Sequence, residues 1–422
     1  MARDTAPEAD TSASSSASTS SSAAPAASSF DTVVDRSRSN SMKWTFADSL
    51  LAPDEAAAEP LPMWVADTDF KAPQAVLDAL HDAVDHGVLG YPGGATDGYL
   101  DAVVNWQARR FGWEISRDWV VPAAGVITSL KTVVQAFSAP GDSVLIQPPV
   151  YVHFHEDVRL NGRHLAYAPL ERTEDGYRFD ARTFEAAIRP DTKLFILSHP
   201  HNPTGNVWTE DELRTMGEIC ARHGVLVVSD EIHQDLVLNP ARTHIPFASL
   251  GPEFARASIT CTAPSKTFNL PGLQCANILI PDHRLREDFS RQYERNVFPL
   301  VNVLGMVAAE AAYTHGEPWL EELLGYLRGN HEHFAKAVHS ATSKLRVLPA
   351  DALYLAWMDC RGLGMDAEAL DRFMLTEARL WLDRGQKFGA EGHGYMRVNL
   401  GCPRSTVDEA IRRLGDALAG LG

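Results

Sequence analysis

Three polar residues of the sequence stand just after three short apolar runs, where they could share one site. Asn202 lies in HNPTG, Asp230 opens DEIH, and Lys266 lies in SKTFN. In an open α/β sheet, ligands bind beyond the carboxyl ends of the strands. We therefore expect these three side chains to meet at one edge of a sheet.

An amide, a carboxylate and an amine in this order match the needs of a pyridoxal cofactor. The amine of Lys266 can bond covalently to the aldehyde of the cofactor. The carboxylate of Asp230 can keep the pyridine nitrogen protonated, so that the ring accepts electrons, and the amide of Asn202 can donate to the phenolic oxygen. Each residue alone has a plainer interpretation: a turn, a helix cap or a solvated lysine. Their combination favours a shared function.

A phosphate group would need a helix N-terminus that a backbone can approach closely, because unpaired N–H groups and the helix dipole attract anions. PAAGVITSLKTVVQAF provides one, with Gly125 at the entry and the amides of Val126 and Ile127 directed at the ligand. Tyr151, which follows two prolines in QPPVYVHF, could stack on a flat ring. It could equally be an ordinary core aromatic.

The elements that must hold these residues alternate between short apolar runs and helical patterns, which indicates a mostly parallel sheet covered by helices. The candidate strands are 143–146, 193–197, 225–229, 259–262 and 277–280. Between the second and third strands, Thr209 and Glu212 form a capping-box pattern and Gly224 ends the helix. The segment from 193 to 229 is therefore predicted to be a right-handed βαβ unit.

Beyond about Gln292 the pattern changes to longer helical stretches, which indicates a smaller α+β domain. Its predicted elements are helices over 303–313, 319–339, 366–379 and 405–418 and a strand over 353–358.

Composition excludes several classes of protein. The 422 residues carry a net charge of -17 and no basic run, which disfavours a nucleic-acid partner or an anionic membrane surface. No apolar stretch reaches the roughly 18 residues of a membrane span. The five cysteines form no CxxC pair, so we expect no metal site and a reduced, cytoplasmic protein. Residues 1–29 are rich in Ser and Ala and are predicted to be a disordered tail.

The sequence resembles the fold type I PLP-dependent enzymes of the class I/II aminotransferase superfamily, where PLP is pyridoxal 5'-phosphate. HNPTG, SDEIH and SKTFN carry that resemblance. WVADTDF, DEIH and TAPSKTFNLPGL are similar to the cystathionine or cysteine-S-conjugate β-lyase branch. The resemblance implies an N-terminal segment (30–75) packing on the small domain, a large PLP-binding domain (76–292) with a mostly parallel, seven-stranded sheet, and a small domain (293–422).

The resemblance also implies a role for each matching residue. Lys266 would hold PLP and remove the α proton of the substrate, Asp230 would pair with the pyridine nitrogen, and Asn202 would bind the ring oxygen. Tyr151 would stack on the ring. Arg397, in GYMRVN, would bind the substrate carboxylate with a two-pronged contact.

Tyr91, in GYPG, would reach the phosphate bound by a second subunit, which implies a homodimer with shared sites. Three positions depart from the wider superfamily: Gln274 stands where an arginine is common, Ala263 where a hydroxyl is common, and His233 where a tyrosine is common. The phosphate site is therefore expected to depend on Ser265, the amides of Val126 and Ile127, and Tyr91, with His233 also facing the cofactor.

The branch implies β-elimination: loss of the α proton, expulsion of a thiol from the β-carbon, and release of pyruvate and ammonia. L-cystathionine or another cysteine S-conjugate is the expected substrate. Transamination shares the early steps and remains an alternative. A regulatory protein on the same fold is a second alternative, which the complete set of chemical residues disfavours.

Overall fold

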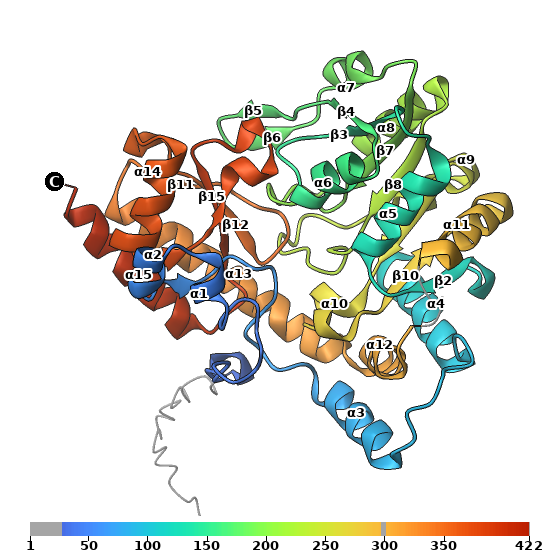
Figure 1. Ribbon diagram of the computed structural model, residues 1–422, viewed down its shortest axis with the longest axis horizontal. Coiled ribbons are helices and arrows are strands. Elements are labelled where there is room, and N and C mark those ends of the chain that lie inside the picture. Colours follow the sequence, from blue (N-terminus) through green and yellow to red (C-terminus); the bar gives the residue numbers. More distant parts are fainter. Residues whose placement is uncertain (1–27, 297–300, 422) are drawn as a thin grey trace, which may run out of the picture.

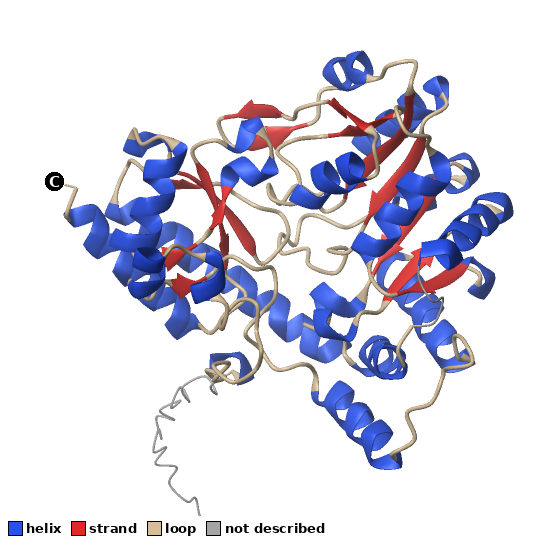
Figure 2. Ribbon diagram, viewed as in Figure 1, coloured by secondary structure: helices blue, strands red, loops and turns tan. Residues whose placement is uncertain are grey.

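The computed structural model describes residues 28–296 and 301–421 (Figure 1). The predicted tail, 1–29, lies outside this range except for its last two residues. Two sheets organise the chain (Figure 2), the larger on the right of the view and the smaller on the left.

A seven-stranded sheet forms the larger half, in the order β2-β10-β9-β8-β7-β3-β4. Its strands are β2 (Val120–Ala123), β3 (Ser143–Ile146), β4 (His164–Tyr167), β7 (Thr192–Ser198), β8 (Leu226–Asp230), β9 (Ser258–Thr262) and β10 (Ala276–Leu279). β10 runs antiparallel to both of its neighbours, β2 and β9, and all the other neighbouring pairs are parallel. The predicted α/β class and mostly parallel sheet are confirmed, and all five predicted strands belong to this sheet.

The central strands of the large sheet are covered on both faces, which explains why apolar side chains occur on both sides of a strand such as β7. In β7, Leu194 and Ile196 pack in a cluster with α5 (Val126–Phe137), α6 (Val152–Leu160) and α11 (His283–Asn296). Phe195 and Leu197, which alternate with them, pack in a cluster with α8 (Glu210–His223). A strand covered on both sides needs apolar side chains on both.

The unit β7-α8-β8 confirms the predicted βαβ connection. The Thr209 hydroxyl accepts from the Glu212 amide, and the Glu212 carboxylate accepts from the Thr209 amide at 2.9 Å. Gly224 ends the helix with a φ of 66°, in the left-handed region where glycine is favoured.

A four-stranded sheet, β11-β12-β15-β14, forms the smaller half. Its strands are β11 (Arg346–Val347), β12 (Leu355–Asp359), β14 (Asp383–Arg384) and β15 (Tyr395–Asn399). β12 begins two residues later than predicted, since Leu353 has a φ of 78° and cannot continue a strand. The helix predicted over 366–379 is α14 (Ala367–Arg372) followed by a π-helical turn (Phe373–Glu377).

The remaining elements connect or cover these two sheets. The helices are α1 (Ala47–Leu50), α2 (Pro53–Ala57), α3 (Gln74–His86), α4 (Asp97–Phe111), α7 (Ala181–Ala187), α9 (Pro252–Arg256), α10 (Pro264–Thr267), α12 (Val303–His315), α13 (Glu317–Ala341) and α15 (Arg404–Ala419). The strands are β1 (Leu61–Pro62), β5 (Glu171–Thr173), β6 (Gly176–Arg178) and β13 (Leu380–Trp381). α12 packs against α3 and α4. Within the described ranges, no helix is long and apolar enough to cross a membrane.

The segment from 61 to 69 joins the two halves. β1 pairs with β13, and the amide of Asp69 donates to the Gly401 carbonyl at 2.8 Å. Asn399, on β15, donates its side-chain amide to the carbonyls of Val65 and Asp67. Asn269, just beyond α10, binds the backbone of Thr68 from the other side. The segment is therefore fixed by side chains from both halves.

Candidate active site

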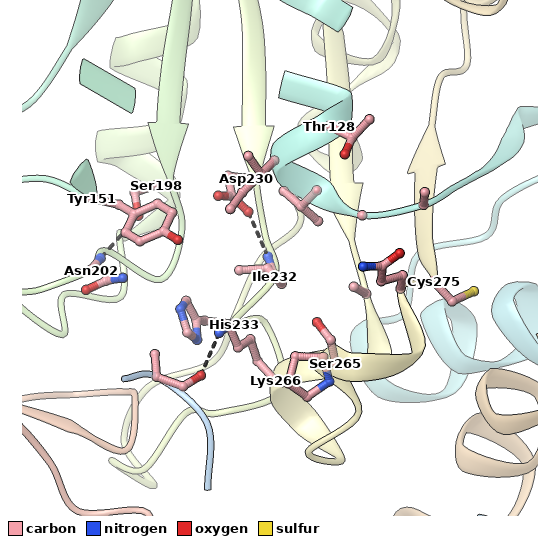
Figure 3. Close-up of a pocket in the computed structure, with 18 residues that line it drawn as sticks. Thr128, Tyr151, Ser198, Asn202, Asp230, Ile232, His233, Ser265, Lys266 and Cys275 are labelled. Atoms are coloured by element: carbon pink, nitrogen blue, oxygen red, sulfur yellow. Dashed lines mark hydrogen bonds between the residues drawn. The ribbon is translucent and has the colours of Figure 1, made fainter. Parts of the chain in front are cut away.

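One cavity of about 240 Å³ collects most of the predicted site residues (Figure 3). It lies beyond the carboxyl ends of β7, β8 and β9 and beside the N-terminus of α5. Nine of the eleven predicted residues line it: Gly125, Val126, Ile127, Tyr151, Asn202, Asp230, His233, Ser265 and Lys266. Ala66, Thr128 and Ser198 also line the cavity, although no sequence pattern indicated a role for them.

Lys266 is held at the cavity wall by α10, a single turn that begins at Pro264. Its Nζ donates a hydrogen bond of 2.6 Å to the carbonyl of Ala66, which lies in the segment that joins the two halves. Burial, and then the positive charge of Arg397, lower the pKa of this amine to about 8, against the opposing effect of Asp67 and Asp230. A fraction of the amine is therefore neutral near pH 7 and available as a nucleophile.

Asp230 is the last residue of β8 and is 7% exposed. Its Oδ1 accepts from the amide of Ile232 at 3.2 Å. Burial raises the pKa of the carboxyl to about 7, although Lys266 acts in the opposite direction. A positively charged ring nitrogen beside Asp230 would restore the ionised form, because an opposite charge favours a carboxylate. Figure 3 shows Asp230 and Lys266 on opposite sides of the cavity.

Arg397, on β15, reaches the cavity through Asn202. Its Nη1 donates to Asn202 Oδ1 at 3.1 Å, and its Nη2 donates to Asp383 Oδ2 at 2.6 Å. Arg397 is 4% exposed, and its Nε has no hydrogen-bond partner among the described residues. A buried guanidinium with unused donor capacity suits a carboxylate ligand. Asp383 was missed because no local pattern marks an aspartate that pairs fourteen residues away.

The N-terminus of α5 faces the cavity with its first amides uncapped by any described side chain. Gly125 is the N-cap residue and makes no side-chain bond, and a Cβ added to it would meet nothing within 4 Å. Open space beside these amides suits a phosphate, since the N-terminal amides and the dipole attract anions. Ser265 and Gln274 line the same cavity. The structure thus brings Gly125, Val126 and Ile127 to the cavity, and their contact with a phosphate stays a prediction.

His233 and Tyr151 complete the described wall. His233 is 4% exposed, and its Nδ1 has no partner in the described part of the chain. Burial, and then Lys266 and Arg397, hold the pKa of His233 well below its usual value, so the imidazole is neutral. Tyr151 is the N-cap residue of α6, and burial raises the pKa of its hydroxyl. Both can present uncharged groups to a flat ring.

Tyr91 is not among the described residues that line the cavity. It lies between α3 and α4 and is 90% exposed. Its predicted contact with a second subunit stays a prediction.

The donor set fits pyridoxal 5'-phosphate. One cavity presents an amine for the aldehyde, a carboxylate for the ring nitrogen, an amide for the ring oxygen and a helix N-terminus for the phosphate. His233 Nδ1, buried without a described partner, is a further polar atom that a ligand could satisfy.

Comparison with known proteins agrees with this geometry. The family model for aminotransferase class I and II matches residues 65–414. The chain belongs to that family.

Three proteins are similar to this chain over more than nine-tenths of its length. Cystathionine beta-lyase PatB of Bacillus subtilis (strain 168) is 42% identical over 393 residues, which cover 92% of this chain and all of that protein. Cystalysin from Treponema denticola, a structure that contains PLP, superposes with a TM-score of 0.88 at 32% identity, covering 93% of this chain and 99% of that one. The PLP-bound C-S lyase from Staphylococcus hominis superposes with a TM-score of 0.86 at 30% identity, with the same coverage. The fold type I architecture and the lyase branch expected from the sequence are confirmed.

The rate at which the apoprotein captures PLP should follow the ionisation of Lys266, because only the neutral amine attacks an aldehyde. With a pKa lowered to about 8, the neutral fraction falls about tenfold for each pH unit below 8. Ionisation of Asp230, with a pKa of about 7, acts in the same direction. Stopped-flow absorbance should show capture accelerating between pH 6 and 8 and then levelling off. A midpoint near 10.5, the ordinary value for lysine, would contradict the burial argument.

Proposed function

We propose that this chain is a PLP-dependent carbon–sulfur β-lyase that cleaves L-cystathionine or other cysteine S-conjugates to a thiol, pyruvate and ammonia. The carrying observation is the convergence of Lys266, Asp230 and the Asn202–Arg397 pair on one cavity. The relatives named above, which include a cystathionine beta-lyase and a C-S lyase, support the choice of reaction.

Bound PLP supplies an electron-withdrawing ring that takes up the negative charge left when the α proton is removed. The residues of the chain provide the rest. Lys266 would hold the aldehyde and, as a free amine, would accept the α proton of the substrate. Asp230 holds the proton on the ring nitrogen, and Asn202 donates to the ring oxygen. The uncapped amides of α5 hold the phosphate.

Arg397 binds the carboxylate of the amino-acid substrate and thereby fixes where the α-carbon lies. Asp383 orients the guanidinium from behind with its 2.6 Å contact, and the Trp64 carbonyl accepts from the same Nη2 at 3.1 Å. A carboxylate on the cavity side would occupy the remaining donors. The sulfur substituent of the β-carbon is then the group that leaves, and the cavity must accommodate it.

The functional unit of this proposal is a cytoplasmic homodimer. The exposed loop that carries Tyr91 suits a contact with a second copy, in which Tyr91 would approach the phosphate site of the partner. All five cysteines are buried and none forms a disulfide within the described residues, which suits a reducing compartment. The boundaries 30–75, 76–292 and 293–422 are proposed as the N-terminal segment, the large domain and the small domain.

Arg397→Ala should raise KM for the amino-acid substrate roughly 10- to 100-fold, because hydrogen bonds to a charged carboxylate are lost. PLP should stay bound, since Lys266, Asp230 and the N-terminal amides of α5 still hold it. Arg384→Ala is the matched control: its neighbour in sequence is Asp383, but its side chain pairs with Asp371 at 2.5 Å and is 41% exposed. Steady-state kinetics of both variants measure KM. An unchanged KM in Arg397→Ala would refute the carboxylate contact.

Purified holoenzyme incubated with L-cystathionine should release thiol, pyruvate and ammonia in equal amounts. A coupled assay measures pyruvate, and a thiol reagent measures the sulfur product. The alternative is transamination, because the family model that matches this chain describes aminotransferases of class I and II. Transfer of the amino group to a 2-oxo acid without thiol release would overturn the lyase proposal.

A further inference from the structure

Asp235 is a buried carboxylate outside the cavity, five residues beyond Asp230, and is 3% exposed. Its Oδ2 accepts from the hydroxyl of Thr267 at 2.8 Å, and its Oδ1 accepts from the indole N–H of Trp106 at 3.0 Å. Both donors are fully buried. A buried carboxylate costs free energy unless such bonds offset its lost hydration.

Burial disfavours the ionised form of the Asp235 carboxyl. Burial raises the pKa of its carboxyl to about 6, and Glu317 adds to this, while the Thr267 bond, Arg110 and the Trp106 bond act against it. At neutral pH the carboxylate is ionised and both of its oxygens accept hydrogen bonds. An ionised acceptor makes a stronger and more directional bond than a neutral one.

Thr267 is the residue directly after Lys266, and the two share the single turn of α10. Asp235 lies at the end of the turn that begins with Asp230, where the amide of Leu236 bonds the carbonyl of His233. The backbone pairing of β8 with β9 ends near Glu231, whose amide donates to the Cys261 carbonyl. Beyond that point, the Thr267–Asp235 bond links the segment that carries the amine to the segment that carries the carboxylate.

We propose that Asp235 is a positioning residue that sets the separation between the Lys266 amine and the Asp230 carboxylate by anchoring Thr267. This inference rests on the binding of PLP by Lys266 proposed above and does not depend on which reaction follows. If the anchor is lost, α10 is free to shift, so that the amine and the carboxylate no longer match the two ends of one ring.

Four single variants and one double variant test the anchor, each measured with the full chain. Thr267→Val removes the hydroxyl while keeping the shape of the side chain, and Thr267→Ser keeps the hydroxyl. Asp235→Asn removes the charge and one acceptor. Trp106→Phe is the matched control, because it removes the other hydrogen bond to Asp235 while leaving the Thr267 bond in place and keeping an aromatic ring against Phe268, which follows α10. The measurements are the Kd of apoprotein for PLP, the absorbance spectrum of the bound cofactor, and the thermal midpoint.

Thr267→Val and Asp235→Asn should each weaken PLP binding about tenfold, the scale of one lost bond to a charged group, and should change the spectrum of the bound cofactor. Thr267→Ser should behave as the unmodified protein. Trp106→Phe should lower the thermal midpoint while leaving the Kd unchanged. The double variant with Asp235→Asn and Thr267→Val should bind PLP no more weakly than Asp235→Asn alone, since both act on one bond.

An unchanged Kd and spectrum in Thr267→Val would overturn the proposal. It would also fall if Trp106→Phe weakened PLP binding as much as Thr267→Val, because Asp235 would then act only through core stability. These outcomes are separate from the fate of the lyase proposal. An unmodified protein that binds PLP without releasing thiol would overturn the lyase reaction and leave the role of Asp235 intact.

Discussion

The site depends on keeping a buried amine and a buried carboxylate on opposite walls of one cavity. Each is unfavourable there: burial lowers the pKa of Lys266 to about 8 and raises the pKa of Asp230 to about 7. A flat cofactor with an aldehyde at one end and a ring nitrogen at the other would offset both costs, because it would bond to the amine and pair with the carboxylate. The desolvation of these two groups therefore favours the binding of such a cofactor.

The connecting segment from Trp64 to Thr68 brings the two halves of the molecule to that cavity. Its successive carbonyls accept side-chain bonds from Arg397, Asn399, Lys266, Asn399 and Asn269. Tyr354 donates to the same Ala66 carbonyl as Lys266, at 2.9 Å. Arg397 on β15 and Lys266 on α10 thus bind carbonyls only two residues apart, although they come from different halves of the molecule. The position of this segment therefore determines where the side chains of Arg397 and Lys266 lie.

Features that depend on a local sequence pattern could be predicted from the sequence. Strands covered on both faces read as apolar runs, and Asn202, Asp230 and Lys266 were recognisable because each follows such a run with a side chain of distinct chemistry. Asp383, the Ala66 carbonyl and Asp235 were not found, because their importance comes from partners brought together by folding. Lys266 and Ala66 are 200 residues apart. The π-helical turn over Phe373–Glu377 likewise leaves no mark in an otherwise helical pattern.

Borohydride reduction of the holoenzyme, followed by peptide mass spectrometry, tests the central claim most directly, because it fixes the cofactor to whichever amine holds it. Lys43 is the informative competitor: it is also buried, at 1% exposure, but its Nζ pairs with Asp69 at 2.7 Å. We expect a single phosphopyridoxyl group on the peptide that contains Lys266. Its attachment to Lys43 or to any other lysine would show that Lys266 does not hold the cofactor.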